Sequence, residues 1–226
     1  MKKLSLLLFF VSALAFSQSP WTQKKGKVYT QISYSTISNY DKLFGDPDYA
    51  TERKITDNTV QLYAEYGISN NVTLIVNVPY KMLKTGDLVS DFQAPVGNVQ
   101  TTKTSKNVLG NASIGLKRVF YKRKWMISGQ LTAMKSVTEF DNASGLKAGY
   151  DSYIFTPLIL LGKSSEKTYF QFFTGANFFV NNYSSQFKVG GEFGFRPFKG
   201  LWLAGFIDVN LSMKNGQFVV TESNKK

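Results

Sequence analysis

Hydrophobic and polar residues alternate along much of this chain, and the alternation is clearest over residues 58–84. In the first half of this stretch, Val60 and Leu62 fall on one face, while Gln61 and Glu65 fall on the other. A period of two indicates a β-strand, because successive side chains of a strand point to opposite faces. A polar Ser-Asn-Asn turn separates the two halves, so the stretch is predicted to form an amphipathic hairpin.

The same alternation continues through the chain and predicts an all-β protein, an antiparallel up-and-down transmembrane β-barrel of about ten strands, with a range of about 8–12. The predicted strands cover residues 27–36, 59–68, 72–81, 107–121, 125–137, 152–162, 168–180, 185–196, 201–212 and 217–222. Most reach the roughly 9–11 residues with which a tilted strand crosses a bilayer, whereas strands of soluble sheets usually have about 5–6. Long connections over residues 37–55, 85–106 and 138–151 alternate with short turns, as in barrels of the outer membrane.

A secreted soluble β-sandwich or a lipocalin-like barrel is the alternative architecture. It would show the same alternation, with the apolar faces turned inward to form a core. Periodicity alone does not separate the two arrangements. The strand lengths and the alternation of long and short connections favour the membrane barrel.

The amino end has the pattern of a secretory signal peptide. Lys2 and Lys3 form a basic start, residues 4–11 are apolar, and small residues come next. The apolar run is too short to span a membrane as a helix, so it is predicted to be a cleaved signal rather than an anchor. We expect cleavage after Ser17, with cleavage after Ala15 as the alternative.

This pattern divides the chain into three predicted parts. Residues 1–17 are the signal peptide, residues 18–26 an exposed periplasmic leader, and residues 27–226 the barrel in the outer membrane of a Gram-negative cell. Trp21 in the leader fits three roles: an anchor at the membrane interface, a plug, or part of a free tail.

Composition limits the chemistry that the chain can carry. It has 226 residues, of which 43% are hydrophobic, so one barrel-sized domain is expected. Cysteine and histidine are both absent. Histidine is the usual base beside a nucleophilic serine and the commonest metal ligand, and the carboxylates are not clustered at ligand spacing. We therefore expect no enzymatic activity, no metal and no cofactor.

The formal net charge of +12 raises the question of nucleic acid as a partner. The basic residues are scattered, however, and many fall at predicted strand ends, as in residues 122–124 and at Lys163, Lys167 and Lys199. Strand ends are where a membrane strand meets anionic phosphates. The predicted partners are therefore outer-membrane lipid, lipopolysaccharide and a small-molecule solute, and not nucleic acid.

Three short motifs carry a resemblance to a known family. They are TDNTVQLYAEYG at residues 56–67, NVPY at 77–80 and GNASIGLK at 110–117. Together they resemble the meta-pathway-of-phenol-degradation family of outer-membrane β-barrel proteins. The resemblance implies a porin-like transporter that moves small molecules, apolar ones included, across the outer membrane. Two features depart from the family pattern: Asn111 stands where an aspartate is expected, and the last residues include no aromatic side chain.

The candidate functional residues are the charged side chains on the predicted inward faces. They are Glu65, Lys81, Lys117, Lys188, Glu192, Arg196 and Asp208. Inward charges set selectivity if the lumen conducts. If the barrel is narrow, they pair with one another and fill it, because barrels of about eight strands are filled by side chains or hold one small ligand.

The predicted function is passive passage or binding of a small molecule by an outer-membrane barrel. The alternative is a structural or interaction barrel that displays the three long connections to a partner or to lipopolysaccharide. A third possibility is a soluble lipid-binding protein of the periplasm.

Overall fold

The computed structural model of the protein describes residues 18–43, 49–88, 103–136, 149, 152–180 and 183–216. The predicted signal peptide, the predicted strand 217–222 and nearly all of the connection 138–151 lie outside the described residues.

The described residues form a single antiparallel sheet, so the all-β prediction is confirmed. Its strands are β1 (Val28–Leu43), β2 (Tyr49–Ser69), β3 (Val72–Leu88), β4 (Ser105–Leu109), β5 (Asn111–Lys122), β6 (Met126–Ser136), β7 (Tyr153–Ser164), β8 (Thr168–Phe179), β9 (Gln186–Phe198) and β10 (Leu201–Ser212). The described part of the chain contains no helix that is long and apolar enough to cross a membrane.

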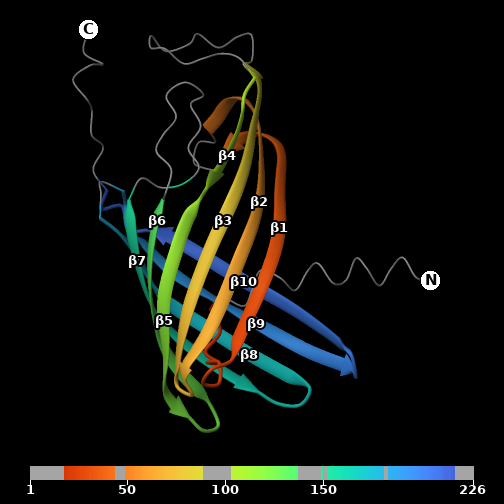
Figure 1. The fold of residues 1–226 in the computed structure, drawn as a ribbon, viewed down its shortest axis with the longest axis vertical. Coiled ribbons are helices and arrows are strands. Elements are labelled where there is room, and N and C mark those ends of the chain that lie inside the picture. The colour runs from red at the N-terminus through yellow and green to blue at the C-terminus, as the bar shows by residue number, and fades with distance from the viewer. Residues whose placement is uncertain are drawn as a thin grey trace.

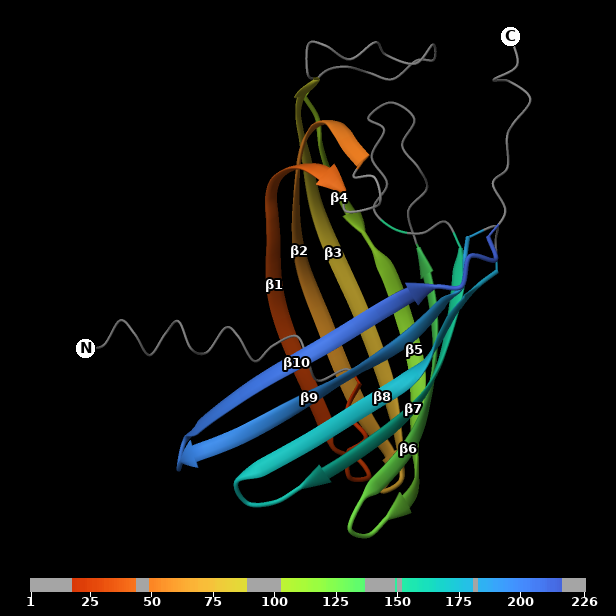
Figure 2. The ribbon, with the colours of Figure 1, turned by 180° about the vertical axis from the view of Figure 1, so that it is seen from behind.

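The sheet follows the chain order, β1-β2-β3-β5-β6-β7-β8-β9-β10, with β4 paired to β3 beside β5. It curls into an open half-barrel, and two opposite views show β8, β9 and β10 lying across from β1, β2 and β3 (Figures 1 and 2). Within the described residues, no pairing joins β1 to β10. We call the concave side of this curl the inner face and the convex side the outer face.

Ten strands are observed, as predicted, but they are formed by partly different residues from those predicted. The predicted strand 107–121 is divided at Gly110 into β4 and β5, and both pair with β3. Tyr80 pairs with Leu109, whereas Asn77 pairs with Ser113, so one extra residue enters the strand between them. This is the register change of a β-bulge, and it makes two strands of what the pattern predicts as one.

The first three strands are longer than predicted, with 16, 21 and 17 residues. The predicted connection 37–55 is therefore wrong over most of its length, because residues 37–43 lie in β1 and residues 49–55 in β2. In the predicted connection 85–106, only residues 85–88 and 105–106 lie in strands, and residues 89–102 are outside the described residues. Polar residues continue the pairing in the first of these segments: Lys42 pairs with Ala50, and the Asn39 backbone N–H donates to Thr56 Oγ1 at 3.1 Å. Polar and turn-forming side chains resemble a loop in sequence even when cross-strand hydrogen bonds hold them in a sheet.

Large apolar side chains cover the outer face. Ile32 is 75% exposed and Ile207 is 69% exposed, whereas Thr73 and Lys117 on the inner face are fully buried. The same alternation holds on β2, β5 and β9, where the exposed positions are mainly apolar and many buried ones polar or glycine. The expected arrangement, apolar outside and ionisable inside, is thus present on an open rather than a closed sheet.

One part of the inner face is apolar. On β7, whose two faces the sequence pattern does not distinguish, Leu158 and Leu160 are buried and Ile159 is exposed. Leu158 and Leu160 form a cluster with Phe173 of β8. This cluster packs the neighbouring strands β7 and β8 together.

We predict that Leu160→Ala lowers the free energy of unfolding by about 2–5 kcal/mol, because it leaves a cavity in a packed cluster. Ile159→Ala is the matched control on the opposite face of β7. It is expected to cost much less, because the medium outside the sheet fills the space. Denaturant titrations of both variants, followed by tryptophan fluorescence, measure the difference. Equal losses would contradict the assignment of faces on β7.

Candidate functional site on the inner face

The leader, residues 18–26, lies against the inner face of the sheet. Ser19 is buried, and Pro20 is among the largest fully buried side chains. The expectation of a wholly exposed leader is therefore wrong. The sequence of this segment has no periodicity that would indicate burial, and its cover comes from strands far away in the chain.

On one side, the leader is bound to the β2–β3 hairpin. Gly26 N donates to Gly67 O at 2.8 Å, and Gly67 N donates to Lys27 O at 2.9 Å, so the end of the leader extends the pairing of β1 with β2. Gln23 N donates to Thr73 Oγ1 of β3 at 2.8 Å. A side chain at Gly67 would overlap the Lys24 carbonyl, which explains the need for glycine there.

On the other side, the leader contacts β6, β7 and β8. Ser128 Oγ of β6 donates to the Pro20 carbonyl at 2.5 Å. A Cβ atom at Gly162 of β7 would overlap the Pro20 ring. Trp21 makes an edge-to-face contact with Tyr169 of β8, with ring centroids 6.3 Å apart.

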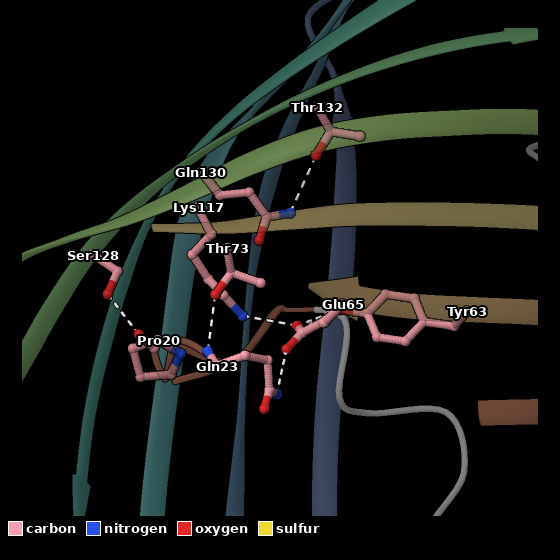
Figure 3. Close-up of polar contacts among 9 residues, drawn as sticks. All are labelled: Pro20, Gln23, Tyr63, Glu65, Thr73, Lys117, Ser128, Gln130 and Thr132. Atoms are coloured by element: carbon pink, nitrogen blue, oxygen red, sulfur yellow. Dashed lines mark hydrogen bonds and ion pairs between the residues drawn. The ribbon is translucent and has the colours of Figure 1, made fainter. Parts of the chain in front are cut away.

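Glu65 is the centre of the polar contacts on this face (Figure 3). Its Oε1 accepts hydrogen bonds from Lys117 Nζ at 2.9 Å and from Tyr63 Oη at 2.6 Å. Its Oε2 accepts one from Gln23 Nε2 of the leader at 2.7 Å. The side chains of Glu65 and Lys117 are 4% and 0% exposed, so the ion pair is shielded from solvent. Such a pair is held in place by its partners, because either charge alone would be costly to bury.

A second ion pair lies near the open edge of the sheet. Lys188 Nζ of β9 contacts both carboxylate oxygens of Asp208 of β10 at 2.8 Å. The same ammonium group lies 5.5 Å from the centre of the Phe173 ring. Asp208 is partly exposed, whereas Lys188 is almost buried. This pair therefore offers a charged surface that solvent or a solute can reach.

The remaining predicted site residues have different partners. Glu192 accepts from Gln171 Nε2 at 3.0 Å and from the Tyr169 hydroxyl. Lys81 pairs with Asp57, and the Arg196 guanidinium lies 5.9 Å from the centre of the Trp202 ring. The seven predicted residues are thus distributed along the inner face and form separate contacts rather than one cluster.

The alternation predicts the inward residues but misses several of their partners. Tyr63 has the parity of Glu65 along β2, so the alternation places it on the same face, and the same parity could have indicated Asp57. Gln23 and Pro20 of the leader carry no such signal, because residues 18–26 do not alternate. Ser128 has the parity of an inward residue on its strand, but only the structure shows that its partner is the leader.

Some buried polar groups of the inner face have no partner within the described residues. They include the amide oxygens of Gln130 and Gln171, which are both buried. Gln130 does use its amide nitrogen, which donates to Thr132 Oγ1 at 3.1 Å (Figure 3). Buried acceptors of this kind usually accept hydrogen bonds from ordered water. In the part of the chain that the structure describes, no group of acidic residues is placed to hold a metal ion.

Comparison of the chain with protein-family models and with curated proteins finds no match. The resemblance to the phenol-degradation family therefore stays a prediction.

We predict that Lys117→Met lowers the free energy of unfolding by about 3–5 kcal/mol, because it leaves the Glu65 carboxylate buried without its counter-charge. The double variant Glu65→Gln/Lys117→Met should recover a large part of this loss. The control is Lys103→Met, which breaks an exposed pair with Asp87 and should change stability little. Denaturant titration of the wild type and the three variants measures these differences. A Lys117→Met variant as stable as the Lys103→Met variant would refute the buried-pair interpretation.

Proposed function

We propose that this protein is an outer-membrane β-barrel that lets a small molecule pass or binds it, without catalysis. The observation that carries the proposal is the division of the sheet into an apolar outer face and a polar inner face. Lys117 and Glu65 are buried on the inner face, while Ile32 and Ile207 are exposed on the outer face.

The outer face supports the membrane part of the proposal. Soluble monomers rarely expose contiguous apolar patches larger than a few hundred Å². Here large apolar side chains are exposed on every strand from β1 to β10. Hydrocarbon covers such a surface at little cost. A soluble lipid-binding protein would need these side chains inside, where the sheet instead has Glu65 and Lys117.

The short-turn end of the sheet has the residues of a membrane interface. Lys163 lies 5.4 Å from the centre of the Trp125 ring, and both residues are exposed. The turn at residues 122–124 is basic and exposed. Aromatic rings and long basic side chains are enriched where a membrane protein meets the headgroups. This placement favours lipid phosphates over nucleic acid as the partner of the net positive charge.

Closure of the barrel can be argued from the direction of the strands. The main path of the sheet has β1 at one edge and β10 at the other, with every neighbouring pair antiparallel. Because nine strands lie on this path, β1 and β10 run in the same direction. Unpaired edges are costly in hydrocarbon, so a membrane barrel must join them. One further strand, predicted at residues 217–222, would join the two edges in the antiparallel sense.

The inner face supports passage or binding of a small solute rather than an open channel. A barrel of about ten strands is close to the size at which side chains fill the interior. Two ion pairs neutralise their own charges, Glu65 with Lys117 and Lys188 with Asp208. This lowers the electric field that a solute would meet. The apolar cluster of Leu158 on the same face offers a contact for an apolar solute.

A specific observation favours the interaction barrel as a second candidate. The strand β2 has 21 residues, about twice the roughly 9–11 that cross a bilayer. The ends of β1, β2 and β3 away from the short turns would therefore project beyond the membrane. A rigid projecting sheet could present a surface to a partner or to lipopolysaccharide.

We predict that the protein fractionates with the outer membrane, needs detergent for extraction, and shows heat-modifiable mobility in gel electrophoresis. Liposomes that contain it should swell in small solutes faster than protein-free liposomes. Recovery in the soluble fraction without detergent would refute the membrane assignment. Membrane-inserted protein with no swelling would favour the interaction barrel instead.

We predict that truncation after Gly216 abolishes the heat-modifiable folded band, because it removes the strand proposed to close the barrel. Truncation after Glu222 is the matched control, since it removes only the last four residues of the chain. It should retain the folded band. Folding of both truncated proteins to the same extent would contradict closure by residues 217–222.

A further inference from the structure

The contacts of the leader cross the inner face from one part of the curled sheet to another. They begin on the β2–β3 hairpin, at Gly67 and Thr73, and end on β6, β7 and β8. β8 lies across from β2 and β3 in the curled sheet (Figure 2). Nine extended residues reach at most about 30 Å, so the leader is long enough to span this space.

The strand residues that the leader touches, which we call the wall, lie at one end of the sheet. Thr73, Ser128, Gly162 and Tyr169 are all within two residues of a strand end at a short turn. In an outer-membrane barrel the short turns face the periplasm. The leader therefore lies at the end of the inner face where a solute would enter or leave the periplasm.

We propose that the leader is an internal plug that closes the short-turn end of the lumen and restricts passage through it. This inference rests on the proposed membrane-barrel function. The plug is part of the chain itself, so its local concentration is high without any partner protein.

Complementary hydrogen-bonding groups hold the plug. The sheet offers two acceptors, Thr73 Oγ1 and Glu65 Oε2, and the leader meets both with N–H groups of Gln23. The wall also offers a donor, Ser128 Oγ, and the leader meets it with the carbonyl of Pro20. These contacts are specific for a backbone in one position, unlike the contacts of a mobile tail.

The shape of the wall also fits the plug. Gly162 has no side chain where the Pro20 ring contacts β7, and any Cβ atom there would overlap the ring. Trp21 reaches Tyr169, whose hydroxyl donates to Glu192 on the neighbouring strand. The plug is therefore connected to β9 through Tyr169, as well as to the strands that it touches.

The absence of cysteine allows a direct test of the position of the leader. Cysteines in the double variant Pro20→Cys/Gly162→Cys should form a disulfide in the membrane-inserted protein, because the Pro20 ring lies where a side chain at position 162 would extend. The control Pro20→Cys/Ile159→Cys places the second thiol on the exposed outer face and should form none. A non-reducing peptide map detects the bond. Its absence from the first variant would overturn the position of the plug.

Liposome swelling tests whether the plug blocks passage. In one variant, residues 20–23 are replaced by Gly-Ser-Gly-Ser, which removes the Pro20, Trp21 and Gln23 side chains. This variant should swell several-fold faster than the wild type, and a synthetic peptide of residues 18–26 added in excess should slow it again. The same peptide with Gln23→Ala and Trp21→Ala should not. The oxidised Pro20→Cys/Gly162→Cys protein should swell no faster than the wild type.

Two failures are distinguishable. If the wild type and the Gly-Ser variant swell at the same measurable rate, passage exists and the plug does not restrict it, so the inference is overturned. If neither the wild type nor the Gly-Ser variant causes swelling although both are inserted, the proposed passage of solutes is refuted, and the leader has no passage to restrict. Heat-modifiable mobility of each variant shows that its barrel has folded.

Discussion

The buried carboxylate of Glu65 connects three parts of the chain that are far apart in sequence. Its hydrogen-bond donors are Tyr63 on its own strand, Lys117 on β5 and Gln23 in the leader. Burial of a lone carboxylate is costly, and the cost falls only when donors and a counter-charge are in place. The position of this one group therefore depends on the pairing of β2 with β3, of β3 with β5, and on the leader at once.

The same constraint explains how the inner face can be both polar and packed. Two ion pairs on it match opposite charges, Glu65 with Lys117 and Lys188 with Asp208, while the Glu192 carboxylate accepts hydrogen bonds from the neutral donors Gln171 and Tyr169. The same face carries the apolar cluster around Leu160, which needs no polar partner. A face composed in this way buries charged groups that have hydrogen-bonding partners beside apolar side chains that need none. Asp208 is partly exposed, so solvent reaches the ion pair at the open edge of the sheet. The pair of Glu65 and Lys117 beneath the leader is shielded from solvent.

The alternation of residue types was enough to predict most strands and their faces. A strand with one apolar and one polar face has only one register that keeps the two apart, so the sequence specifies it strongly. This is why the pattern alone could place Glu65, Lys117 and Lys188 on the inner face. Where both faces are apolar, as on β7, the pattern specifies no orientation, and only the packing of Leu160 against Phe173 decides it.

The parts that could not be predicted depend on long-range contacts. An isolated glycine such as Gly110 is a local signal of a bulge, but the pairing of β3 with the segments on both sides of it is seen only in the structure. The leader has no periodicity, and its burial depends on partners about 40–110 residues away.

The open edge of the sheet at β1 and the docking of the leader on the inner face are related. Edge strands present unpaired backbone groups, and the pairing of Gly26 with Gly67 extends the ladder between β1 and β2 at the short-turn end. The leader then turns inward from this ladder, because the Gln23 side chain reaches Glu65 and its backbone amide reaches Thr73 on the inner face. These contacts leave the outer edge of β1 clear of the leader. In a closed barrel that edge is available to the strand that completes the ring, while the leader occupies the interior that the ring encloses.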